Sequence, residues 1–549
     1  MTDRLAIAFA QLNQVMGDLS GNAERMLGVR ADCPDADLVV YPELQLIGYP
    51  PEDLVLKPAL VEQAAAELER MAAASADGPA MLVGTVIAEK GKLYNAMILL
   101  DSGKVAAITR KHRLPNYGTF DELRLFAAGP MPDPIEIRGV KIGVPICEDI
   151  WVDGVSAHLA AQGAELLIVP NGSPYEVDKD DIRLALGKAR VATTGLPLAY
   201  LNRVGGQDEL VFDGSSFVLN KDGEIAWQFA DWEEEVATTI WERQESGWAC
   251  TDGPQHRLDE NPADIYHAML IGLRDYVNRN RFPGVVLGLS GGIDSALSAA
   301  IAVDALGADR VWCVMMPSRF TSQESLDDAA ECAAMLGCKL DTIPIMPAIE
   351  GFDAMLEDSF ADANVDITEE NIQSRIRGVT LMALSNKFGH MLLTTGNKSE
   401  MAVGYATIYG DMAGGYSVLK DAYKLTVFAL SRFRNAQKPS LAMGPDGPVM
   451  PDNVIDKPPS AELRDDQKDS DSLPDYEILD PILRGLVEEE VSVEEIVSRG
   501  FDRETVTRIE RLLYIAEYKR RQAPPGVKIG ARNFGRDRRY PITNAFRTV

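Results

Sequence analysis

The stretch Ser290-Gly291-Gly292-Ile293-Asp294-Ser295 contains the residue types that most directly indicate chemistry. An apolar run at 285–289 precedes it and an alanine-rich run follows it, which predicts a strand, a tight glycine turn and the start of a helix. Glycines let backbone N–H groups approach a phosphate, and a helix N-terminus adds partial positive charge. Asp294 beside that phosphate would carry a metal ion. The stretch therefore predicts an anion site, and a purely structural glycine turn is the alternative.

This motif lacks the lysine of the G-x-x-x-x-G-K-[ST] loop found in ordinary nucleotide hydrolases. S-G-G-x-D-S instead resembles the pyrophosphate loop of the ATP pyrophosphatase family, whose members transfer AMP to a carboxyl or carbonyl oxygen and release pyrophosphate. The resemblance implies that ATP is a co-substrate. It assigns ATP binding to eight consecutive positions: Gly288, Leu289, Ser290, Gly291, Gly292, Ile293, Asp294 and Ser295.

Length and composition describe an ordinary globular chain with more than one domain. A single hydrophobic core cannot accommodate 549 residues, and the apolar fraction is 46%. A net charge of −29 argues against nucleic acid as a partner. No run reaches the roughly 18 apolar residues of a membrane span, so no membrane partner is expected. Six scattered cysteines without a C-x-x-C pair, and an N-terminus without a signal-peptide layout, favour the cytoplasm.

The first half alternates short apolar runs with helical stretches, which predicts a layered α/β domain. Three polar residues, Glu43, Lys111 and Cys147, follow predicted strands, where the chemistry of α/β sheets is usually found. Together they suffice for acyl transfer: the carboxylate takes the thiol proton, the thiolate attacks an amide carbonyl, and the ammonium stabilises the oxyanion. Taken singly, a buried packing cysteine, a solvated lysine and a surface acid are the alternatives.

Three longer segments around these residues resemble the nitrilase superfamily: Tyr41-Pro-Glu-Leu, Arg110-Lys-His-Arg-Leu-Pro-Asn-Tyr and Ile146-Cys-Glu-Asp-Ile-Trp. The resemblance implies an α-β-β-α sandwich with Glu43, Lys111 and Cys147 as the catalytic triad. The neighbouring Gly48-Tyr-Pro-Pro and Asn171-Gly-Ser-Pro-Tyr are similar to the glutaminase branch of that superfamily.

The glutaminase resemblance implies five glutamine-binding residues: Tyr49, Tyr117, Glu148, Ser173 and Lys179. For Ser173 a plain turn residue, and for Lys179 a solvated charge, remain alternatives. The same resemblance implies that Glu122 orients Lys111.

An irregular stretch rich in glycine, proline and polar residues runs from Trp241 to about Asn261 and indicates a domain boundary. We therefore expect a nitrilase-like domain at 1–245, a linker at 246–262 and a second domain at 263–549. Repeated strand–helix units in the last of these predict a doubly wound parallel sheet, with its ligand at the carboxyl ends of the strands. The segment 438–474, rich in proline and glycine, is expected to be a loop, either ordered by substrate or disordered.

Two later segments complete the prediction for the second domain. Asn371 and Arg375 lie four residues apart on one face of a predicted helix, and Gly396-Asn-Lys-Ser-Glu400 reads as a turn that opens another helix. Each alone is common as helix capping. Together with the pyrophosphate loop they resemble NAD synthetase, of the N-type ATP pyrophosphatases.

The NAD synthetase resemblance implies roles for individual residues. Thr395, Lys424 and Ser460 would contact ATP, and Glu400 would join Asp294 as a ligand of Mg²⁺. The contacts implied for nicotinate adenine dinucleotide (deamido-NAD) are Asn371, Arg375, Glu400 and Lys519. For Lys519, which lies in a basic tail, a solvated charge cluster or a subunit contact is the alternative. Ile408 stands where stand-alone, ammonia-using synthetases carry a basic residue, so their dinucleotide contacts around that position are not carried over.

The resemblances cover nearly the whole chain and imply a carbon–nitrogen ligase that takes ammonia from glutamine and forms NAD⁺, AMP and pyrophosphate. The expected partners are deamido-NAD, ATP, glutamine and further copies of the chain in a homo-oligomer. An internal ammonia channel between the sites is a hypothesis motivated by their fusion. A related amidotransferase–ligase with another acceptor, and a non-catalytic nucleotide sensor, are the alternatives.

Overall fold

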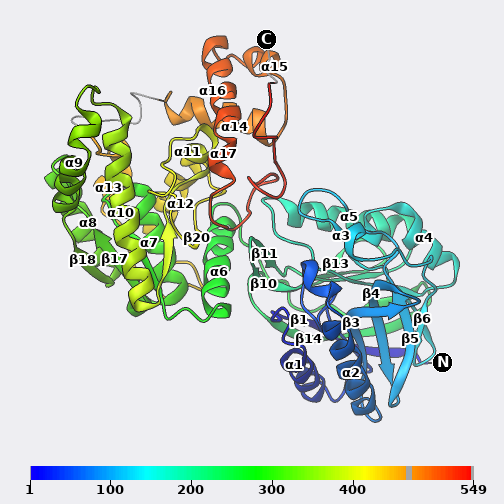
Figure 1. The fold of residues 1–549 in the computed structure, drawn as a ribbon. Helices are drawn as coiled ribbons and strands as arrows, with labels where there is room; N and C mark the ends of the chain where they lie inside the picture. The colour runs from blue at the N-terminus through cyan, green and yellow to red at the C-terminus, as the bar shows by residue number, and fades with distance from the viewer. Residues whose placement is uncertain (1, 465–472, 546–549) are drawn as a thin grey trace. The chain divides into compact units, whose positions relative to one another are not determined.

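The computed structural model describes residues 2–464 and 473–545. The chain divides into two compact units, Met1–Asp259 and Glu260–Val549 (Figure 1). No helix within the described ranges is long and apolar enough to cross a membrane.

The first unit is built on two large sheets. The seven-stranded sheet has the order β15-β14-β1-β2-β3-β4-β5, and the six-stranded sheet has the order β13-β12-β9-β8-β7-β6. The strands of the first sheet are β1 (Arg4–Gln11), β2 (Leu38–Val40), β3 (Ala80–Glu89), β4 (Lys92–Asp101), β5 (Lys104–Arg110), β14 (Glu235–Gln244) and β15 (Gly247–Cys250). Those of the second are β6 (Ile135–Ile137), β7 (Val140–Gly143), β8 (Leu166–Pro170), β9 (Leu198–Leu201), β12 (Phe217–Leu219) and β13 (Ile225–Gln228), and a separate ribbon joins β10 (Val204–Gln207) to β11 (Leu210–Asp213).

Along each strand, successive side chains alternate between a core that lies between the two sheets and a core that lies between a sheet and its covering helices. Leu5, Ile7 and Phe9 of β1 share one buried cluster with Ile142 of β7 and Ile168 of β8, so this cluster lies between the two sheets. The intervening β1 residues, such as Ala8 and Ala10, face a different cluster, because successive side chains of a strand point to opposite faces.

Helices cover both outer faces. On the seven-stranded sheet, Met26 of α1 (Leu19–Asp32) and Met71 of α2 (Pro58–Ala74) pack on Ala8. On the six-stranded sheet, Leu159 of α4 (Asp153–Ala161) and Val191 of α5 (Lys179–Thr194) pack in a third cluster. The predicted α-β-β-α sandwich is confirmed.

One part of the predicted linker belongs to a sheet instead. Residues 247–250 form β15, which pairs with β14 in the register Trp241↔Cys250, and Trp248 is buried in the core between the sheets. The glycine and polar residues here make a hairpin turn, with Gly247 at φ 119°. A hairpin and an interdomain linker use the same turn residues, which is why composition alone did not separate them.

The second unit contains a parallel sheet of order β18-β17-β16-β19-β20. Its strands are β16 (Val285–Gly288), β17 (Val311–Met315), β18 (Lys339–Thr342), β19 (Met391–Thr394) and β20 (Tyr416–Ser417). Because β17 lies on one side of β16 and β19 on the other, the strand order reverses there. Ligands bind beyond the carboxyl ends of strands at such a point, where the segments after β16 and β19 meet.

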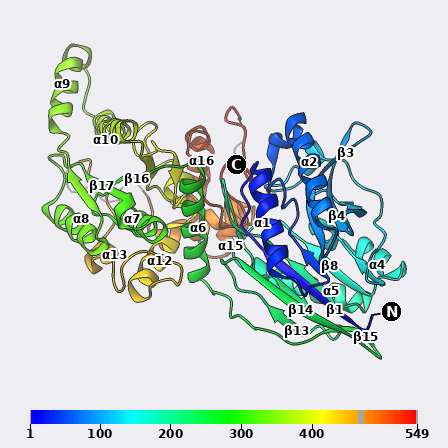
Figure 2. The same ribbon diagram turned by 90° about the horizontal axis from the view of Figure 1, so that it is seen from below.

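Helices flank this sheet on both faces. Ile376 and Leu381 of α10 (Ile367–Phe388) pack on Val286 of β16. Val285 and Leu287 are buried too, and by alternation they face the opposite side, where α7 (Ile293–Leu306) contacts β16. The doubly wound parallel sheet is confirmed. The other helices near the sheet are α6 (Ala263–Arg279), α8 (Gln323–Leu336), α9 (Met346–Phe360), α12 (Lys424–Ala436) and α13 (Asp452–Asp456), of which α9 extends from the unit with no buried residue (Figure 2).

A cluster of shorter helices supports the segment after β19. Met401 and Ala402 of α11 (Lys398–Val403) are buried against Leu479 of α14 (Tyr476–Val487) and Leu513 of α16 (Arg503–Ile515). The helices α15 (Val493–Ser498) and α17 (Glu517–Arg520) complete this part of the unit.

A buried ion pair connects the helices behind the glycine turn. Arg434 of α12 donates to both carboxylate oxygens of Asp304 in α7, at 2.6 and 3.1 Å, and Tyr266 of α6 donates to the same carboxylate at 2.6 Å. Arg434 also donates to the carbonyl oxygens of Pro445 and Gly447, so it orders the start of the predicted loop. Residues 465–472 of that loop lie outside the described residues.

Replacing Asp304 by alanine will leave the Arg434 charge buried without its carboxylate partner. We expect the free energy of opening of α7 and α12 to fall by about 3–5 kcal/mol, measured by amide hydrogen exchange with mass spectrometry. Asp446→Ala is the control, because that carboxylate is 93% exposed in its pair with Lys438 and its loss should change little. Equal protection of α7 and α12 from hydrogen exchange in D304A and the unmodified protein would show that the Asp304–Arg434 ion pair does not stabilise these helices.

Candidate active sites

Glu43, Lys111 and Cys147 converge in the buried interior of the first unit. Glu43 follows β2, Lys111 follows β5, and Cys147 opens a short 3-10 helix, η2 (Cys147–Ile150), after β7. Lys111 Nζ donates to Glu43 Oε1 at 2.7 Å and lies 2.9 Å from the Glu122 carboxylate. The side chains of Lys111 and Glu43 are fully buried, and Cys147 is 5% exposed.

Burial and charge set the protonation of this constellation. Burial raises the pKa of the Cys147 thiol well above its usual value and the Glu43 carboxylate raises it further, against the opposing effect of Lys111. Burial lowers the pKa of Lys111, but the Glu122 and Glu43 carboxylates outweigh it and the net pKa is raised. At neutral pH the thiol is therefore protonated and the lysine charged, so a base must take the thiol proton before attack.

Glu43 is positioned as that base by two further donors. The Asn95 side-chain amide donates to Glu43 Oε1 at 2.7 Å, and the Gly172 backbone N–H donates to Oε2 at 2.9 Å. Asp149 fixes the turn that carries Cys147, because its carboxylate accepts from the backbone N–H groups of Ile146 and Arg113. It thereby connects the cysteine turn to the chain just after Lys111.

The predicted glutamine-binding residues lie around this centre. Tyr49 donates its hydroxyl to Glu122 at 3.3 Å, and Tyr117 donates to Glu148, the neighbour of Cys147, at 3.0 Å. Ser173 is buried beside Gly172, and its backbone exchanges two 3.0 Å hydrogen bonds with the Asn202 side chain.

Lys179 begins α5, and its ammonium lies 3.3 Å from Glu176. The Lys179 side chain is 13% exposed, so it is largely out of water and is not a solvated surface charge.

In the second unit, the glycine turn lines a cavity of about 290 Å³ at the carboxyl ends of β16 and β19. Seven of the eight positions predicted from the motif face this cavity: Gly288, Leu289, Ser290, Gly292, Ile293, Asp294 and Ser295. The cavity wall also includes Thr395, Glu400, Lys424 and Ser460. Predicted residues that are distant in sequence therefore meet at one site.

Gly291 is the motif position that does not line the cavity. Its φ is +83°, and a Cβ there would lie 2.3 Å from the Ser325 carbonyl oxygen. The turn needs glycine at this position both for the left-handed conformation and for its close approach to α8.

Asp294 and Glu400 are held close together by two shared partners. Asn397 donates its side-chain amide to Asp294 Oδ1 at 2.9 Å and accepts from the Glu400 backbone N–H at 3.0 Å. Lys424 forms an ion pair with Asp294, and its Nζ lies 3.5 Å from Glu400 Oε1.

The donor set of this pair fits Mg²⁺ that also binds a nucleotide. The described residues contain no group of three or more His, Cys, Asp or Glu side chains that could hold a metal without a substrate. The Asp294–Glu400 pair instead offers two carboxylates. Mg²⁺ is typically bound through one or two carboxylates, with substrate phosphates and water completing its shell.

The three remaining predicted dinucleotide contacts, Asn371, Arg375 and Lys519, all bind the segment 404–408. Asn371 accepts a 2.9 Å hydrogen bond from Thr407, and Arg375 Nε donates to the Ile408 carbonyl oxygen at 3.3 Å. Lys519 Nζ donates to the carbonyl oxygens of residues 404 and 406, at 2.8 and 2.7 Å. These side chains hold the segment that separates the nucleotide cavity from a neighbouring pocket.

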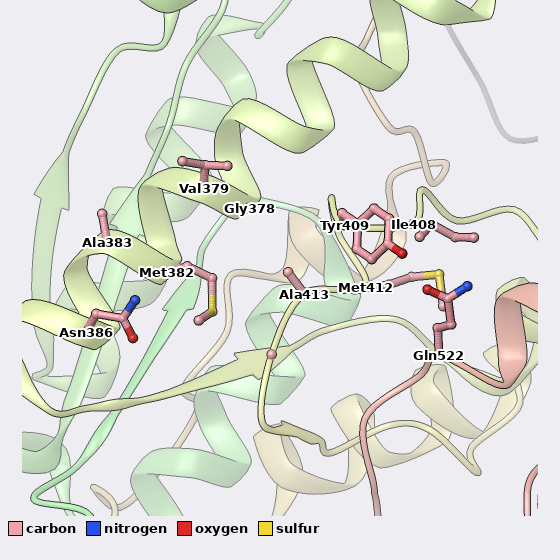
Figure 3. Close-up of a pocket in the computed structure, with 11 residues that line it drawn as sticks. Gly378, Val379, Met382, Ala383, Asn386, Ile408, Tyr409, Met412, Ala413 and Gln522 are labelled. Carbon is pink, nitrogen blue, oxygen red and sulfur yellow. The ribbon is translucent and has the colours of Figure 1, made fainter.

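That neighbouring pocket has a volume of about 530 Å³ and lies between α10 and the segment 408–414 (Figure 3). Met382 of α10 and Met412 of the facing segment contribute flexible apolar walls, and Tyr409 and Gln522 lie at one end. Thioether side chains adapt readily to a planar ligand.

Comparison with known proteins agrees with this division of the chain. Residues 6–246 match the carbon–nitrogen hydrolase family, and residues 265–523 match the NAD synthase family. The glutamine-dependent NAD(+) synthetase of Rhodobacter capsulatus is 53% identical over 552 residues, covering 100% of both chains. The chain belongs to the glutamine-dependent NAD⁺ synthetases.

Other members of the glutamine-dependent NAD⁺ synthetases are similarly close. The Acinetobacter baylyi protein is 46% identical, with 98% of each chain covered. A solved structure of the glutamine-dependent NAD⁺ synthetase from Acinetobacter baumannii, in complex with ADP, superposes with a TM-score of 0.78 at 42% identity, covering 98% of each chain. The predicted family is confirmed along the whole length of the chain.

Several residues of this glutamine-dependent NAD⁺ synthetase were not singled out from the sequence. Asn95, in the middle of β4, stands in no recognisable motif, so its contact with Glu43 follows only from the pairing of β4 with its neighbours. Asp149 stands beside Cys147 and Asn397 stands before Glu400 in the sequence. Their partners, however, are backbone N–H groups for Asp149 and the distant Asp294 carboxylate for Asn397. Arg377 and Asp411 also line the nucleotide cavity, and Asp411 lies three residues after Ile408.

Glu122 will give glutamine hydrolysis a pH-dependent step. Burial, partly offset by Lys111, raises its pKa to about 7, so the second carboxylate beside the lysine forms only as pH rises through that value. We expect kcat/KM for ammonia release to rise over this range, and Glu122→Gln to remove the step. A hydrogen bond to a charged group contributes about 1.5–3 kcal/mol, so E122Q should lower kcat/KM at pH 8 by about tenfold to a hundredfold.

Asp121→Asn is the matched control, because this neighbour pairs with Arg124 at the surface. A pH profile for E122Q that is parallel to that of the unmodified protein would show that Glu122 does not act on Lys111.

Proposed function

We propose that the chain synthesises NAD⁺ by ATP-dependent amidation of deamido-NAD, with ammonia taken from glutamine. One observation carries the proposal: the same chain holds a buried cysteine–lysine–glutamate constellation and a cavity of about 290 Å³ that is lined by the glycine turn and by Asp294 and Glu400. The names of its full-length relatives support the same reaction.

Glutamine hydrolysis uses the three buried residues of the first unit. Glu43 takes the Cys147 proton, and the thiolate attacks the side-chain amide carbon while Lys111 stabilises the oxyanion. The C–N bond breaks, Glu43 passes the proton to the departing ammonia, and a thioester remains. Glu43 then activates a water that hydrolyses the thioester to glutamate and restores the thiol.

The residues around the triad hold the amino acid end of glutamine. Glu148, hydrogen-bonded to Tyr117, offers a carboxylate to the ammonium group of the substrate. Lys179, with the hydroxyl of Ser173, offers donors to its carboxylate. Tyr49 closes the buried side, supported by its hydrogen bond to Glu122.

ATP binds in the cavity of the second unit, with its phosphates on the backbone N–H groups of the glycine turn at the start of α7. The deamido-NAD carboxylate attacks the α-phosphorus, so that pyrophosphate leaves and an acyl adenylate forms. Ammonia then displaces AMP and gives the amide. Asp294 and Glu400 would hold Mg²⁺, which neutralises charge on the departing pyrophosphate when it is bound. Lys424, Thr395 and Ser460 contact the nucleotide.

Deamido-NAD lies against α10 and the segment 404–412. Asn371 and Arg375 project from α10 towards this segment, and the pocket lined by Met382, Met412 and Tyr409 accommodates a planar ring of the dinucleotide. Lys519 supports the segment from behind through its two carbonyl contacts.

The assembly and the compartment are also part of the proposal. Phe352 and Met355 lie three residues apart on α9, a helix with no buried residue, and are 40% and 74% exposed, so this apolar face supports a homo-oligomer. All six cysteines are free thiols, which supports a reducing, cytoplasmic setting.

The overall reaction is tested by product analysis with ATP, glutamine and deamido-NAD. We expect NAD⁺, AMP, pyrophosphate and glutamate in a 1:1:1:1 ratio. ADP and phosphate in place of AMP and pyrophosphate would contradict the adenylate route. Turnover only with a different carboxyl acceptor would favour a related ligase, and absence of any turnover would favour a nucleotide sensor.

Cys147→Ala will separate the two half-reactions. The substitution removes the nucleophile but leaves the second unit unchanged, so we expect loss of NAD⁺ formation with glutamine and its retention with ammonium salts. NAD⁺ is measured with each nitrogen donor, and Cys250→Ala in the same unit serves as the control. Loss of both activities in a folded C147A protein would refute separate sites.

A further inference from the structure

The Lys424 ammonium lies against both Asp294 and Glu400. Its side chain is 1% exposed, it forms an ion pair with Asp294, and it lies 3.5 Å from Glu400 Oε1. These are the two carboxylates that fit Mg²⁺. A lysine ammonium is a compact point charge on a flexible stem, so it can neutralise such a pair.

The ammonium and a divalent cation cannot share this place. A metal ligated by both carboxylates would lie within a few ångströms of Lys424 Nζ, and like charges at such distances repel strongly in a partly desolvated cavity. Asn397 also holds both carboxylates, because its side-chain amide donates to Asp294 Oδ1 at 2.9 Å and its backbone N–H donates to Glu400 Oε2 at 3.3 Å. The carboxylates therefore do not separate to accommodate both cations. One cation must leave for the other to bind.

The contacts of Lys424 allow its side chain to move while its backbone stays in place. Its backbone N–H donates to Ser399 Oγ at 2.9 Å, and Ser399 in turn donates to Asp480. Asp480 also accepts from the Leu425 backbone N–H at 2.8 Å, so the first turn of α12 is fixed to α11 and α14. The side chain itself borders the nucleotide cavity, which gives the ammonium a second place to go.

We propose that Lys424 is an internal counter-ion with two positions. Without nucleotide it neutralises Asp294 and Glu400, and it yields this place to the metal only when ATP phosphates offer its ammonium a new anionic partner. Metal and ATP therefore bind together, and the carboxylate pair binds free divalent ions weakly. This inference rests on the proposed function, because that function supplies the metal and the nucleotide.

The test measures metal binding without any reaction. Mn²⁺ binding to the full chain is followed by electron paramagnetic resonance, in the absence of ATP, deamido-NAD and glutamine. Removing the competing charge with Lys424→Met should tighten Mn²⁺ binding by about tenfold or more, since a neighbouring unit charge contributes more than 1.4 kcal/mol in such a site. With Mn²⁺ present, K424M should bind ATP at least about tenfold more weakly, because the phosphates lose a cation.

Three variants make the outcome specific. Lys424→Arg keeps the charge and should retain weak Mn²⁺ binding without nucleotide. Lys438→Met removes a partly exposed lysine that pairs with Asp446 in the same unit, and should change neither measurement. Asp294→Asn in the K424M background should abolish the gain in Mn²⁺ affinity, which locates the gain at the carboxylate pair.

Unchanged or weaker Mn²⁺ binding in a folded K424M protein overturns the inference, as does a gain in affinity that persists with Asp294→Asn. If K424M does not fold, Lys424→Gln replaces it, with the same expected gain. Failure of the proposed function is separately visible. Tighter Mn²⁺ binding by K424M, with no NAD⁺ or AMP formed by the unmodified protein, would support the counter-ion role of Lys424 and contradict the proposed synthetase activity.

Discussion

A buried ammonium shared between two carboxylates is the interaction on which both sites depend. Lys111 lies between Glu43 and Glu122 in the first unit, and Lys424 lies between Asp294 and Glu400 in the second. A single charge is costly to bury without a partner, whereas the lysine lets two acidic groups lie close together, buried in the first site and 18% exposed in the second. Once Glu122 is ionised, each site holds two carboxylates against one ammonium, and this excess of negative charge is the property needed by a general base in one case and by a cation site in the other.

The two architectures bring these groups together in the same physical way, although their folds differ. In the sandwich, Glu43, Lys111 and Cys147 each follow a strand, and the edge where strands end leaves backbone N–H groups such as that of Gly172 available as donors. In the parallel sheet, the reversal of strand order between β16 and β19 brings the glycine turn and α11 side by side. Loops supply the reactive groups, and the sheets fix the distances between them.

Motifs predicted the reactive groups better than they predicted the groups that orient them. The triad, the glycine turn and Glu400 stand in short sequence patterns, so both folds and most candidate residues followed from the chain alone. Asn95 could not, because its contact with Glu43 depends on strand pairing across distant segments. Composition predicts a linker where the chain in fact forms the hairpin that contains Trp248, since turn residues do not show whether the next segment pairs with the same sheet. The neighbours of Lys424 come from three other helices, α7, α11 and α14, a proximity that no local pattern encodes.

The raised pKa of Cys147 has a consequence for the chemical durability of the protein. The thiolate is the form that peroxides and electrophiles attack, and oxidation beyond the sulfenic acid is largely irreversible. Because burial keeps this sulfur protonated at rest, the nucleophile is inert towards such reagents until its proton is removed during turnover. The same desolvation that makes a base necessary thus also protects the sulfur from oxidative damage.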